Sequence, residues 1–451
     1  MAGSPGSGMT RVRKLTMSAT ASSIADAAWA GIDPEGCFRR HASDTEPFLL
    51  KFPGLGDVLF VSTVDGARDI LTAPGTLCRA PLPNPIEPVV GQNSLILLSG
   101  DAHRRTRSIL MPAFRGERMR SYVDLIADAT NEEITALQPG DQLVVRDAAQ
   151  AITLDVVIRV VFGVTDRARR AEYARVINEL MRSGTAPLML VPWLRREIAG
   201  RGPWARLVGF RAQLDALLSE QIEERSGLGE HGSDVMELIL TATDEDGNTL
   251  GDDALRDQLR TVLAAGHETS STSLAWALYH IHRDESIRSR VIEELTGAST
   301  PGEIAALPYL GAVIHETLRM HPTVPIVLRR LTGPLTVAGV PRAAGDVVGI
   351  ALPALHFNPD VWKHPDSFDP DRFRERKPSP FEYAPFGGGF RRCIGATFAQ
   401  HELAVTIGTI LKTVELRMPA REQRRKPPRA VPRGIATKPN RDILLDVIAR
   451  R

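Results

Sequence analysis

Cys393 is the residue whose surroundings point most directly to metal chemistry. It follows three consecutive glycines, an aromatic residue and two arginines, and it precedes an apolar run that predicts a helix. Glycines let backbone amides approach a flat group closely, and cationic neighbours stabilise a thiolate, whose free thiol has a pKa of about 8.5. His401 is the nearest downstream candidate for a second ligand, but eight residues of helix span roughly 12 Å. The pattern predicts a metal held by one thiolate rather than a closed zinc site.

For a lone cysteine, the alternative is an inert, buried thiol at a turn. The residues around Cys393 argue against it, because several recur at fixed spacing: Phe386, Gly389, Arg391, Cys393 and Gly395. This pattern resembles the haem-binding loop of the cytochrome P450 family, the haem-thiolate monooxygenases. The resemblance implies haem b as the cofactor, Cys393 as the axial ligand of its iron, and the other four residues as cofactor contacts.

A second group of chemically capable residues lies in a long helix predicted over residues 252–282. Glu268 places a carboxylate beside the hydroxyl of Thr269. A glycine inside a helix costs about 1 kcal/mol relative to alanine, so Gly266 predicts a close neighbour. One face of this helix carries short side chains and a hydroxyl that would line a gap wide enough for dioxygen: Val262, Ala265, Gly266, Thr269 and Ser273.

In the P450 family an acid–alcohol pair at this place guides protons to the oxygen that is being activated. The resemblance therefore implies catalytic roles for Glu268 and Thr269, and a place for Ala265 against the haem. A positioned general acid contributes roughly 10²–10⁴ in rate. The structural alternative is that the Thr269 hydroxyl merely bonds to the carbonyl four residues earlier in the helix.

Basic residues elsewhere match the family positions that contact the haem propionates. His103 and Arg107 are four residues apart in a helix predicted from about residue 101, so they share a face. Arg329 follows an apolar segment, and its planar guanidinium suits a carboxylate. The resemblance implies propionate contacts for these three residues, although the neighbouring Arg330 is an alternative to Arg329.

A charged triad is the third family feature. Glu316 and Arg319 are three residues apart in a predicted helix, and Arg372 follows later in the chain. An exposed pair of this kind would carry little free energy. The resemblance implies a buried structural triad that holds the cysteine loop in place.

The substrate pocket is predicted from apolar residues near the other sites. They come from the proline-punctuated loop before residue 100, the long helix, the segment before Arg329 and a loop tip near the C-terminus: Leu95, Leu97, Val262, Val324, Ile326, Val327 and Ile435. The apolar segment 186–204, which contains Trp193, matches the place of the family's substrate-covering helices. We expect a lipophilic substrate, such as a terpene, fatty acid, steroid or macrolide.

Composition excludes several classes of protein. A net charge of +1 with 24% charged residues argues against a nucleic-acid binder. Three cysteines give no disulfide framework, so we expect Cys37 and Cys78 to be free thiols in a reducing, cytoplasmic location. No apolar span is long enough for a membrane anchor. Residues 1–30 predict a flexible N-terminus, and an organelle transit peptide over residues 1–23 is the alternative.

The periodicity predicts a mainly helical chain with a small β-rich part. Strands are expected at 47–53, 57–62, 336–337 and 347–350, a strand pair over 431–449, and amphipathic helices between residues 117 and 240. The resemblance implies one domain over residues 31–451, with the P450 fold: a triangular prism of helices around haem b.

The activity implied is insertion of one oxygen atom of O₂ into a small molecule by hydroxylation or epoxidation. Electrons would come from NAD(P)H through separate partners, a ferredoxin or flavodoxin with its reductase, because this chain has no flavin or iron–sulfur segment. Arg104 and Arg105 are predicted on the surface, where an electron donor would dock, and the protein is expected to be a monomer. The alternatives are a peroxide-driven peroxygenase, a P450 isomerase or dehydratase, and a non-enzymatic haem sensor; Glu268 and Thr269 argue against all three.

Overall fold

The computed structural model describes residues 29, 31–52, 54–115, 118–185, 188–189, 191–197, 200–228, 234–433 and 436–451. Almost all of the predicted N-terminal segment, residues 1–30, lies outside the described residues, and so does Ile435. The described part is mainly helical with four small sheets, as predicted.

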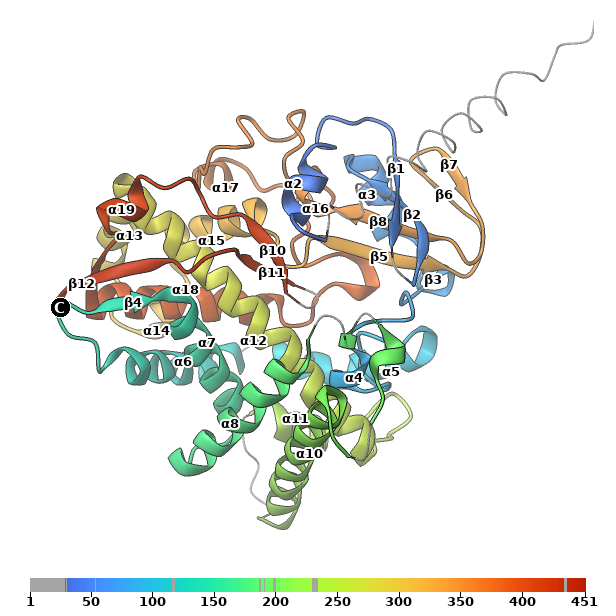
Figure 1. The fold of residues 1–451 in the computed structure, drawn as a ribbon, viewed down its shortest axis with the longest axis horizontal. Helices are drawn as coiled ribbons and strands as arrows, with labels where there is room; N and C mark the ends of the chain where they lie inside the picture. The colour runs from blue at the N-terminus through green and yellow to red at the C-terminus, as the bar shows by residue number, and fades with distance from the viewer. Residues whose placement is uncertain are drawn as a thin grey trace, which may run out of the picture.

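The helix α12 (Asp252–Arg283) crosses the middle of the molecule diagonally in Figure 1. Its first turn carries Asp252 and Asp253, and its last turn carries His282 and Arg283. Acids at the N-terminus and bases at the C-terminus both favour the helix dipole. The predicted extent, residues 252–282, is confirmed to within one residue.

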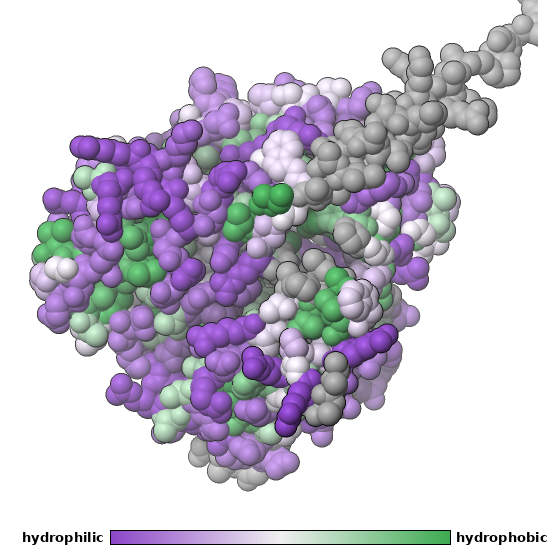
Figure 2. All heavy atoms as spheres, in the orientation of Figure 1, coloured by the Kyte–Doolittle hydropathy of each residue, from purple (hydrophilic) through white to green (hydrophobic). Residues whose placement is uncertain are grey.

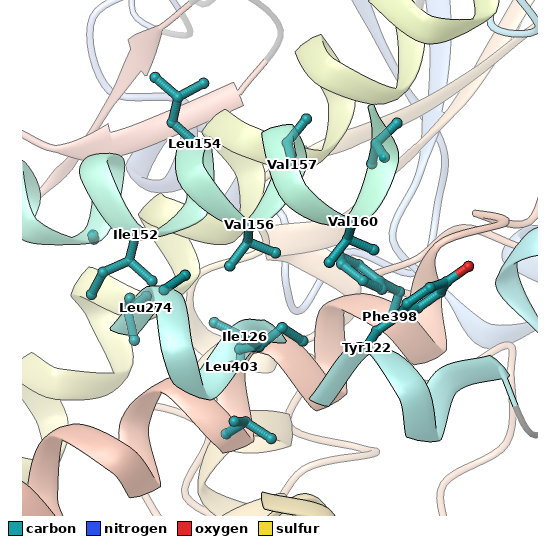
Figure 3. Close-up of a cluster of buried hydrophobic side chains, with 14 of the residues drawn as sticks. Tyr122, Ile126, Ile152, Leu154, Val156, Val157, Val160, Leu274, Phe398 and Leu403 are labelled. Atoms are coloured by element: carbon teal, nitrogen blue, oxygen red, sulfur yellow. The ribbon is translucent and has the colours of Figure 1, made fainter. Parts of the chain in front are cut away.

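Three further helices make the main core with α12: α7 (Val145–Val156) and α18 (Ala396–Thr413) pack against α12, and α6 (Arg118–Ile134) packs against α7 and α18. Figure 3 shows the side chains of Val156 and Val160 pointing toward Ile126 of α6 and Phe398 of α18. The rings of Tyr122 and Phe398 meet edge to face, with centroids 5.9 Å apart. Such apolar packing holds α18, and therefore the cysteine loop before it, against α12.

The chain continues from α7 into a π-helix, η3 (Val157–Val161), so the helical winding changes within this part of the core. All five residues of η3 are buried. Arg159 is among them and pairs with Asp155 and Glu132, both at 2.6 Å. The buried cation is thereby compensated, as a charge in an apolar core requires.

The remaining helices cover this core and connect the sheets. They are α2 (Pro34–Arg39), α3 (Val64–Leu71), α4 (Glu87–Val90), α5 (Gly100–Leu110), α8 (Arg167–Ser183), α10 (Pro203–Leu228), α11 (Val235–Thr241), α13 (Glu285–Thr296), α14 (Pro301–Ala305), α15 (Pro308–Met320), α16 (Leu352–Leu355), α17 (Arg372–Glu375) and α19 (Ala420–Gln423). Short 3₁₀ turns are η1 (Gly75–Leu77), η2 (Met111–Phe114), η4 (Pro192–Leu194) and η5 (Gly389–Arg391).

The largest sheet has five strands in the order β1-β2-β8-β5-β3. Its strands are β1 (Phe48–Phe52), β2 (Gly56–Val61), β8 (Val347–Ala351), β5 (Ile326–Leu331) and β3 (Cys78–Arg79). β1 and β2 form an antiparallel hairpin with Phe48 opposite Phe60, β2 runs parallel to β8, and β5 pairs antiparallel with both β8 and β3. The predicted strands at 47–53, 57–62 and 347–350 are confirmed.

Three smaller sheets complete the β-structure. They are the hairpin of β6 (Leu335–Val337) and β7 (Val340–Arg342), the hairpin of β10 (Ala430–Arg433) and β11 (Ala436–Pro439), and a sheet of β4 (Gln142–Val144), β12 (Leu444–Arg450) and β9 (Val414–Arg417). The strand pair expected over 431–449 is therefore wrong in one respect. β10 pairs with β11, but β12 leaves that hairpin and lies between β4 and β9.

Figure 2 shows one face of the molecule, where hydrophilic side chains dominate and apolar ones form small separate patches. Among the described residues, none of the helices combines the length and the apolar character that a bilayer-spanning segment needs.

Candidate active site

The cysteine loop is closed by a hydrogen bond from the Cys393 backbone N–H to the Phe386 carbonyl, at 2.9 Å. Gly389 has φ +64°, which favours glycine, and a Cβ at that position would lie 2.1 Å from the Leu71 carbonyl oxygen. A Cβ on Gly388 would also meet Leu71, at 2.9 Å. The glycines are thus required for close packing on the end of α3, whereas the sequence predicted an approach to a flat group alone.

Cys393 lies immediately before α18, whose N-cap is Gly395. Its side chain is exposed, yet desolvation by surrounding protein raises the pKa of the thiol. The Gly395 N–H and the charges of Arg392 and Arg107 oppose that rise and favour the thiolate. The sulfur is therefore accessible although protein atoms surround it, and a thiolate in such a position can bind a ligand.

Arg391 does not support the sulfur as the sequence predicted. Its guanidinium donates to the carbonyls of Ile96, at 3.3 Å, and Leu98, and to the Ser99 hydroxyl at 3.1 Å. It therefore ties the cysteine loop to the segment before α5. Arg107 on α5 contributes to the thiolate instead, in addition to the propionate contact expected of it.

One face of α12 is open. Val262, Ala265, Gly266 and Thr269 are half-buried, whereas the intervening Leu263 and most of the helix are buried. Residues at this spacing share one face of a helix, so the face borders a space that the described side chains leave unfilled. The nearest atom to a Cβ built on Gly266 is Val157 Cγ2, at 3.8 Å, so the tight protein neighbour predicted for this glycine is absent among the described residues.

The Thr269 hydroxyl donates to the carbonyl of Ala265, which is the structural alternative considered from the sequence. The bond leaves the oxygen's lone pairs free to accept a second hydrogen bond from the open side of the helix. Ser273 differs from the other residues of the predicted face. It is buried, and its hydroxyl lies 2.9 Å from that of Thr323, so it links α12 to the segment before β5.

Glu268 is held by a residue that the sequence did not suggest. The Arg433 guanidinium at the end of β10 donates to the Glu268 carboxylate at 2.8 Å. The Gln150 side-chain amide is oriented so that its oxygen faces the Arg433 guanidinium. This oxygen accepts hydrogen bonds from both terminal nitrogens of Arg433, at 2.8 and 2.9 Å. Burial raises the pKa of Glu268, and Arg433 and Lys438 oppose the rise.

Four basic residues gather beside the cysteine loop: His103, Arg107, Arg329 and Arg391. Burial, followed by the charges of the three arginines, lowers the pKa of His103 to about 4, so its imidazole is neutral at pH 7. Burial lowers the pKa values of Arg329 and Arg391 to about 10. Within the described part of the chain, no carboxylate pairs with Arg107, Arg329 or Arg391.

A bound anion would compensate the positive charge of this cluster. The Nε atoms of Arg329 and Arg391 are buried and have no hydrogen-bond partner within the described residues, and an unpaired buried donor is costly. Arg329 otherwise reaches only backbone carbonyls, those of Leu328 at 2.8 Å and Gly388 at 3.4 Å. Two carboxylates of a flat cofactor bound between the cysteine loop and α12 would supply the missing negative charge. The donor set therefore fits haem, with its thiolate ligand and two propionates.

Arg330, the alternative to Arg329, points away from the site. It donates to the carbonyls of Gly345 and Leu82, at 2.9 and 3.1 Å. Arg104 and Arg105 are exposed as expected, but Arg104 pairs with Glu245 at 2.9 Å. The exposed arginines whose charges reach Arg107 are Arg115 and Arg392.

The expected triad residues meet in the core. Glu316 and Arg319 are fully buried and form two hydrogen bonds, at 2.7 and 2.8 Å. Arg372 donates to the same carboxylate at 3.0 Å. Arg319 also donates to the carbonyl of His356, whose Nε2 accepts the N–H of Ala384 at 3.0 Å. A continuous chain of hydrogen bonds thus runs from the triad to the start of the cysteine loop.

Comparison with known proteins agrees with this geometry. The family described as Cytochrome P450 matches residues 37–445. The chain belongs to the cytochrome P450 family. Two relatives in Mycobacterium tuberculosis are the putative cytochrome P450 135B1, 33% identical over 383 residues (84% of this chain and 80% of the relative), and the putative cytochrome P450 137, 31% identical over 392 residues (86% and 80%).

The P450 fold is matched independently in three dimensions. The solved structure of the retinoic acid-bound cyanobacterial CYP120A1 superposes with a TM-score of 0.77, covers 89% of this chain and 91% of its own, and is 23% identical. The helical P450 fold predicted for this chain is therefore confirmed, and membership of the P450 family implies a haem cofactor.

The predicted substrate-pocket residues of this P450 differ in burial. Val262, Val324, Ile326 and Val327 are half-buried, and Ile435 lies outside the described residues. Leu95 and Leu97 are buried in the main core, although the segment that carries them contacts α12 through Gln258.

Sequence reasoning missed two buried or partly buried polar residues of this P450, Arg433 and Glu402. Arg433 meets Glu268 from 165 positions away, and no local pattern marks that pairing. Glu402 on α18 is buried with neither carboxyl oxygen hydrogen-bonded among the described residues. Burial raises its pKa to about 8, opposed by the nearby Ser270 hydroxyl of α12. An acid in an otherwise apolar run was the available signal for Glu402.

Proposed function

We propose that this P450 is a monooxygenase that inserts one oxygen atom of O₂ into a lipophilic small molecule, by hydroxylation or epoxidation. Two electrons come from NAD(P)H through separate redox partners, a ferredoxin or flavodoxin with its reductase. Haem, when bound, supplies the activation of O₂ and the transfer of one oxygen atom to carbon.

The chain's own residues bind and orient this cofactor. Cys393 provides the thiolate ligand, favoured by the Gly395 N–H and by the charges of Arg392 and Arg107. Arg107, Arg329 and the neutral His103 offer the donors that two propionates require. The triad of Glu316, Arg319 and Arg372 holds the loop from behind.

The observation that carries the proposal is the open face of α12 beside an acid. Thr269 lies on that face with an acceptor lone pair available, and Glu268 is the preceding residue, with a pKa raised by burial. A carboxyl group whose pKa is raised by burial keeps its proton to higher pH than a free one, and a hydroxyl beside it can pass that proton on. A haem protein that only senses a ligand has no need for such a pair.

The electron donor is proposed to dock beside the cysteine loop. Arg115 and Arg392 are exposed there, and their charges reach Arg107 in the site. A positive patch steers an acidic partner such as a ferredoxin and raises its association rate at low salt. We also propose that the protein is a monomer in the cytoplasm.

The substrate is proposed to be lipophilic because half-buried aliphatic residues, Val262, Val324, Ile326 and Val327, surround the predicted space. A panel of terpenes, fatty acids, steroids and macrolides is titrated into the haem-loaded protein, and displacement of iron-bound water is read as a spin-state shift. Compounds that shift the spectrum are then incubated with NADPH, a ferredoxin and a ferredoxin reductase.

The proposal predicts oxygenated product that contains one atom from ¹⁸O₂ and depends on NADPH. Product formed only with hydrogen peroxide would instead identify a peroxygenase. A spectrum that no compound shifts, together with no turnover, would favour a haem sensor.

A further inference from the structure

A cleft of about 720 Å³ lies apart from the haem site, and none of the residues assigned to that site borders it. Its walls come from α4 and the turn after it, from α10 and from the first turns of α12, which meet in the lower part of Figure 1. Arg195, which follows η4, completes the lining. The volume is in the range of small-molecule sites. Unlike the predicted substrate space, its lining is mostly charged and polar.

The floor of the cleft is a hydrogen-bonded network centred on the buried side chains of Asp257 and Arg260. Asp257 accepts hydrogen bonds from the Asn93 backbone at 2.9 Å and the Asn93 side chain at 3.0 Å, and it pairs with Arg260. Gly91 has φ +85°, and a Cβ there would lie 2.1 Å from the Asp257 carboxylate. Arg260 bridges Asp257 to Asp215 of α10. These contacts fix the three walls relative to one another.

The floor also separates the cleft from the haem side of α12. Gln258 accepts the Leu95 N–H at 3.0 Å and donates to the Asn93 carbonyl. One turn further along, the hydroxyl of Thr261 lies 2.7 Å from that of Ser94. The segment 93–95 is thus sealed onto α12 between the cleft and Val262.

Two arginines of the cleft have unused binding capacity. Arg195 donates only to the carbonyls of Leu188 and Met189, at 2.9 and 2.7 Å, and has no carboxylate partner within the described residues. Arg211 donates to the Pro88 carbonyl at 3.1 Å and lies 3.8 Å from Asp215, whose other oxygen is taken by Arg260. Each guanidinium therefore keeps a terminal nitrogen for an anion.

The other charges of the cleft are compensated or peripheral. Arg256 pairs with Asp253 and Ser219, at 2.5 and 3.0 Å. Glu87 is exposed and has no ion pair within the described residues, so solvent stabilises its charge.

On α10, Trp204 and Arg211 lie two turns apart on one face, about 10 Å along the axis. An aromatic surface and a cation are thus presented at a fixed separation.

We propose that this cleft is a second small-molecule site, which binds an organic anion: a carboxylate or phosphate held by Arg195 and Arg211, with an aromatic or apolar body against Trp204. Guanidinium groups bind such anions with charge-assisted, bidentate hydrogen bonds. Because the site lies across the sealed floor from the haem, its ligand does not enter the position of the oxidised substrate.

The test is to measure dissociation constants by isothermal titration calorimetry. The haem-loaded protein is titrated with 2-naphthoate, 2-naphthyl phosphate and the neutral 2-naphthol. We expect at least one anion to bind and the neutral compound to bind about tenfold more weakly or not at all. Arg195→Gln and Arg211→Gln each weaken anion binding about tenfold or more. Arg182→Gln, an exposed arginine on α8, leaves it unchanged. Whichever anion binds more tightly identifies the carboxylate or phosphate class.

Circular dichroism and the haem absorption spectrum establish that each variant is folded and loaded. The proposal is overturned if neither anion binds, if 2-naphthol binds as tightly as the anions, or if folded Arg195→Gln and Arg211→Gln proteins both keep the wild-type affinity. It is equally overturned if binding shifts the haem spin state and resists both substitutions, because the anion would then occupy the haem pocket. None of these outcomes depends on turnover.

Discussion

Arg433 donates to the carboxylate of Glu268 at 2.8 Å and joins the end of β10 to the middle of α12. The side chains of Glu268 and Arg433 are 14% and 33% exposed, so the pair is partly shielded from water. The arginine thereby opposes the rise that burial causes in the pKa of the acid beside Thr269. Under the proposed function, Arg433 is a positioning residue for proton delivery.

Removing the arginine is expected to shift the pH dependence of turnover. Burial raises the pKa of Glu268, and Arg433 holds that rise back. In Arg433→Gln the carboxyl therefore keeps its proton to higher pH, and the corresponding limb of the pH–rate profile moves to higher pH. Arg433→Lys keeps the charge and restores most of the profile. An unchanged profile in Arg433→Gln would show that Glu268 does not control the rate.

Thr269→Ala is expected to separate electron consumption from product formation. The substitution removes the hydroxyl on the open face of α12 and leaves Cys393 and the basic cluster intact. Haem binding and the absorption spectrum should persist, while NADPH is consumed to make hydrogen peroxide or water instead of product. Thr269→Ser keeps the hydroxyl and should stay coupled. The ratio of product to NADPH oxidised is the measurement, and full coupling in Thr269→Ala would contradict a proton-relay role.

Arg372→Ala is expected to lower the free energy of unfolding by about 3 kcal/mol or more. The residue is buried, shares the Glu316 carboxylate with Arg319, and donates to the carbonyls of Lys363 and Ser367. Arg374→Ala removes an exposed arginine two positions later and serves as the control. Denaturant unfolding of both variants measures the difference. Equal stabilities would mean that the triad is not a structural support.

Glu402 is expected to make the fold less stable as pH rises. Its pKa is raised to about 8 from an ordinary value of 4.5, so the folded chain keeps a proton that the unfolded chain releases above pH 4.5. Stability therefore falls from pH 4.5 to about 8 and then levels off, by on the order of 3–5 kcal/mol for this group. Glu402→Gln removes that contribution, whereas the exposed Glu223→Gln does not. The free energies of unfolding of the wild-type protein and both variants are measured at pH 5 and pH 8. If Glu402→Gln showed the same pH dependence as the wild-type protein, the prediction for Glu402 would be contradicted.

Local patterns made much of this molecule predictable. The spacing around Cys393 marked the loop, helical periodicity placed α12 to within one residue, and Glu316 and Arg319 stood at an interacting spacing. Each of these signals acts over a few residues, where the period of a helix or the geometry of a turn fixes which side chains are neighbours.

Pairings between distant segments were not predictable. Glu268 could have paired with any of the chain's many arginines, and only the position of β10 selects Arg433. The packing of Gly388 and Gly389 on Leu71 depends on where the end of α3 lies, which no pattern in the loop records. The cleft between α4, α10 and α12 likewise exists only once three separate helices have met.

The most direct test of the whole account is the absorption spectrum of the reduced, carbon monoxide-bound protein after haem is supplied. The wild-type chain and Cys37→Ala, which lacks the buried thiol of α2, should both give the spectrum typical of thiolate ligation. Cys393→Ala should lose it. Survival of the thiolate-type spectrum in Cys393→Ala, or its absence from the wild-type protein, would contradict the assignment of Cys393 as the iron ligand.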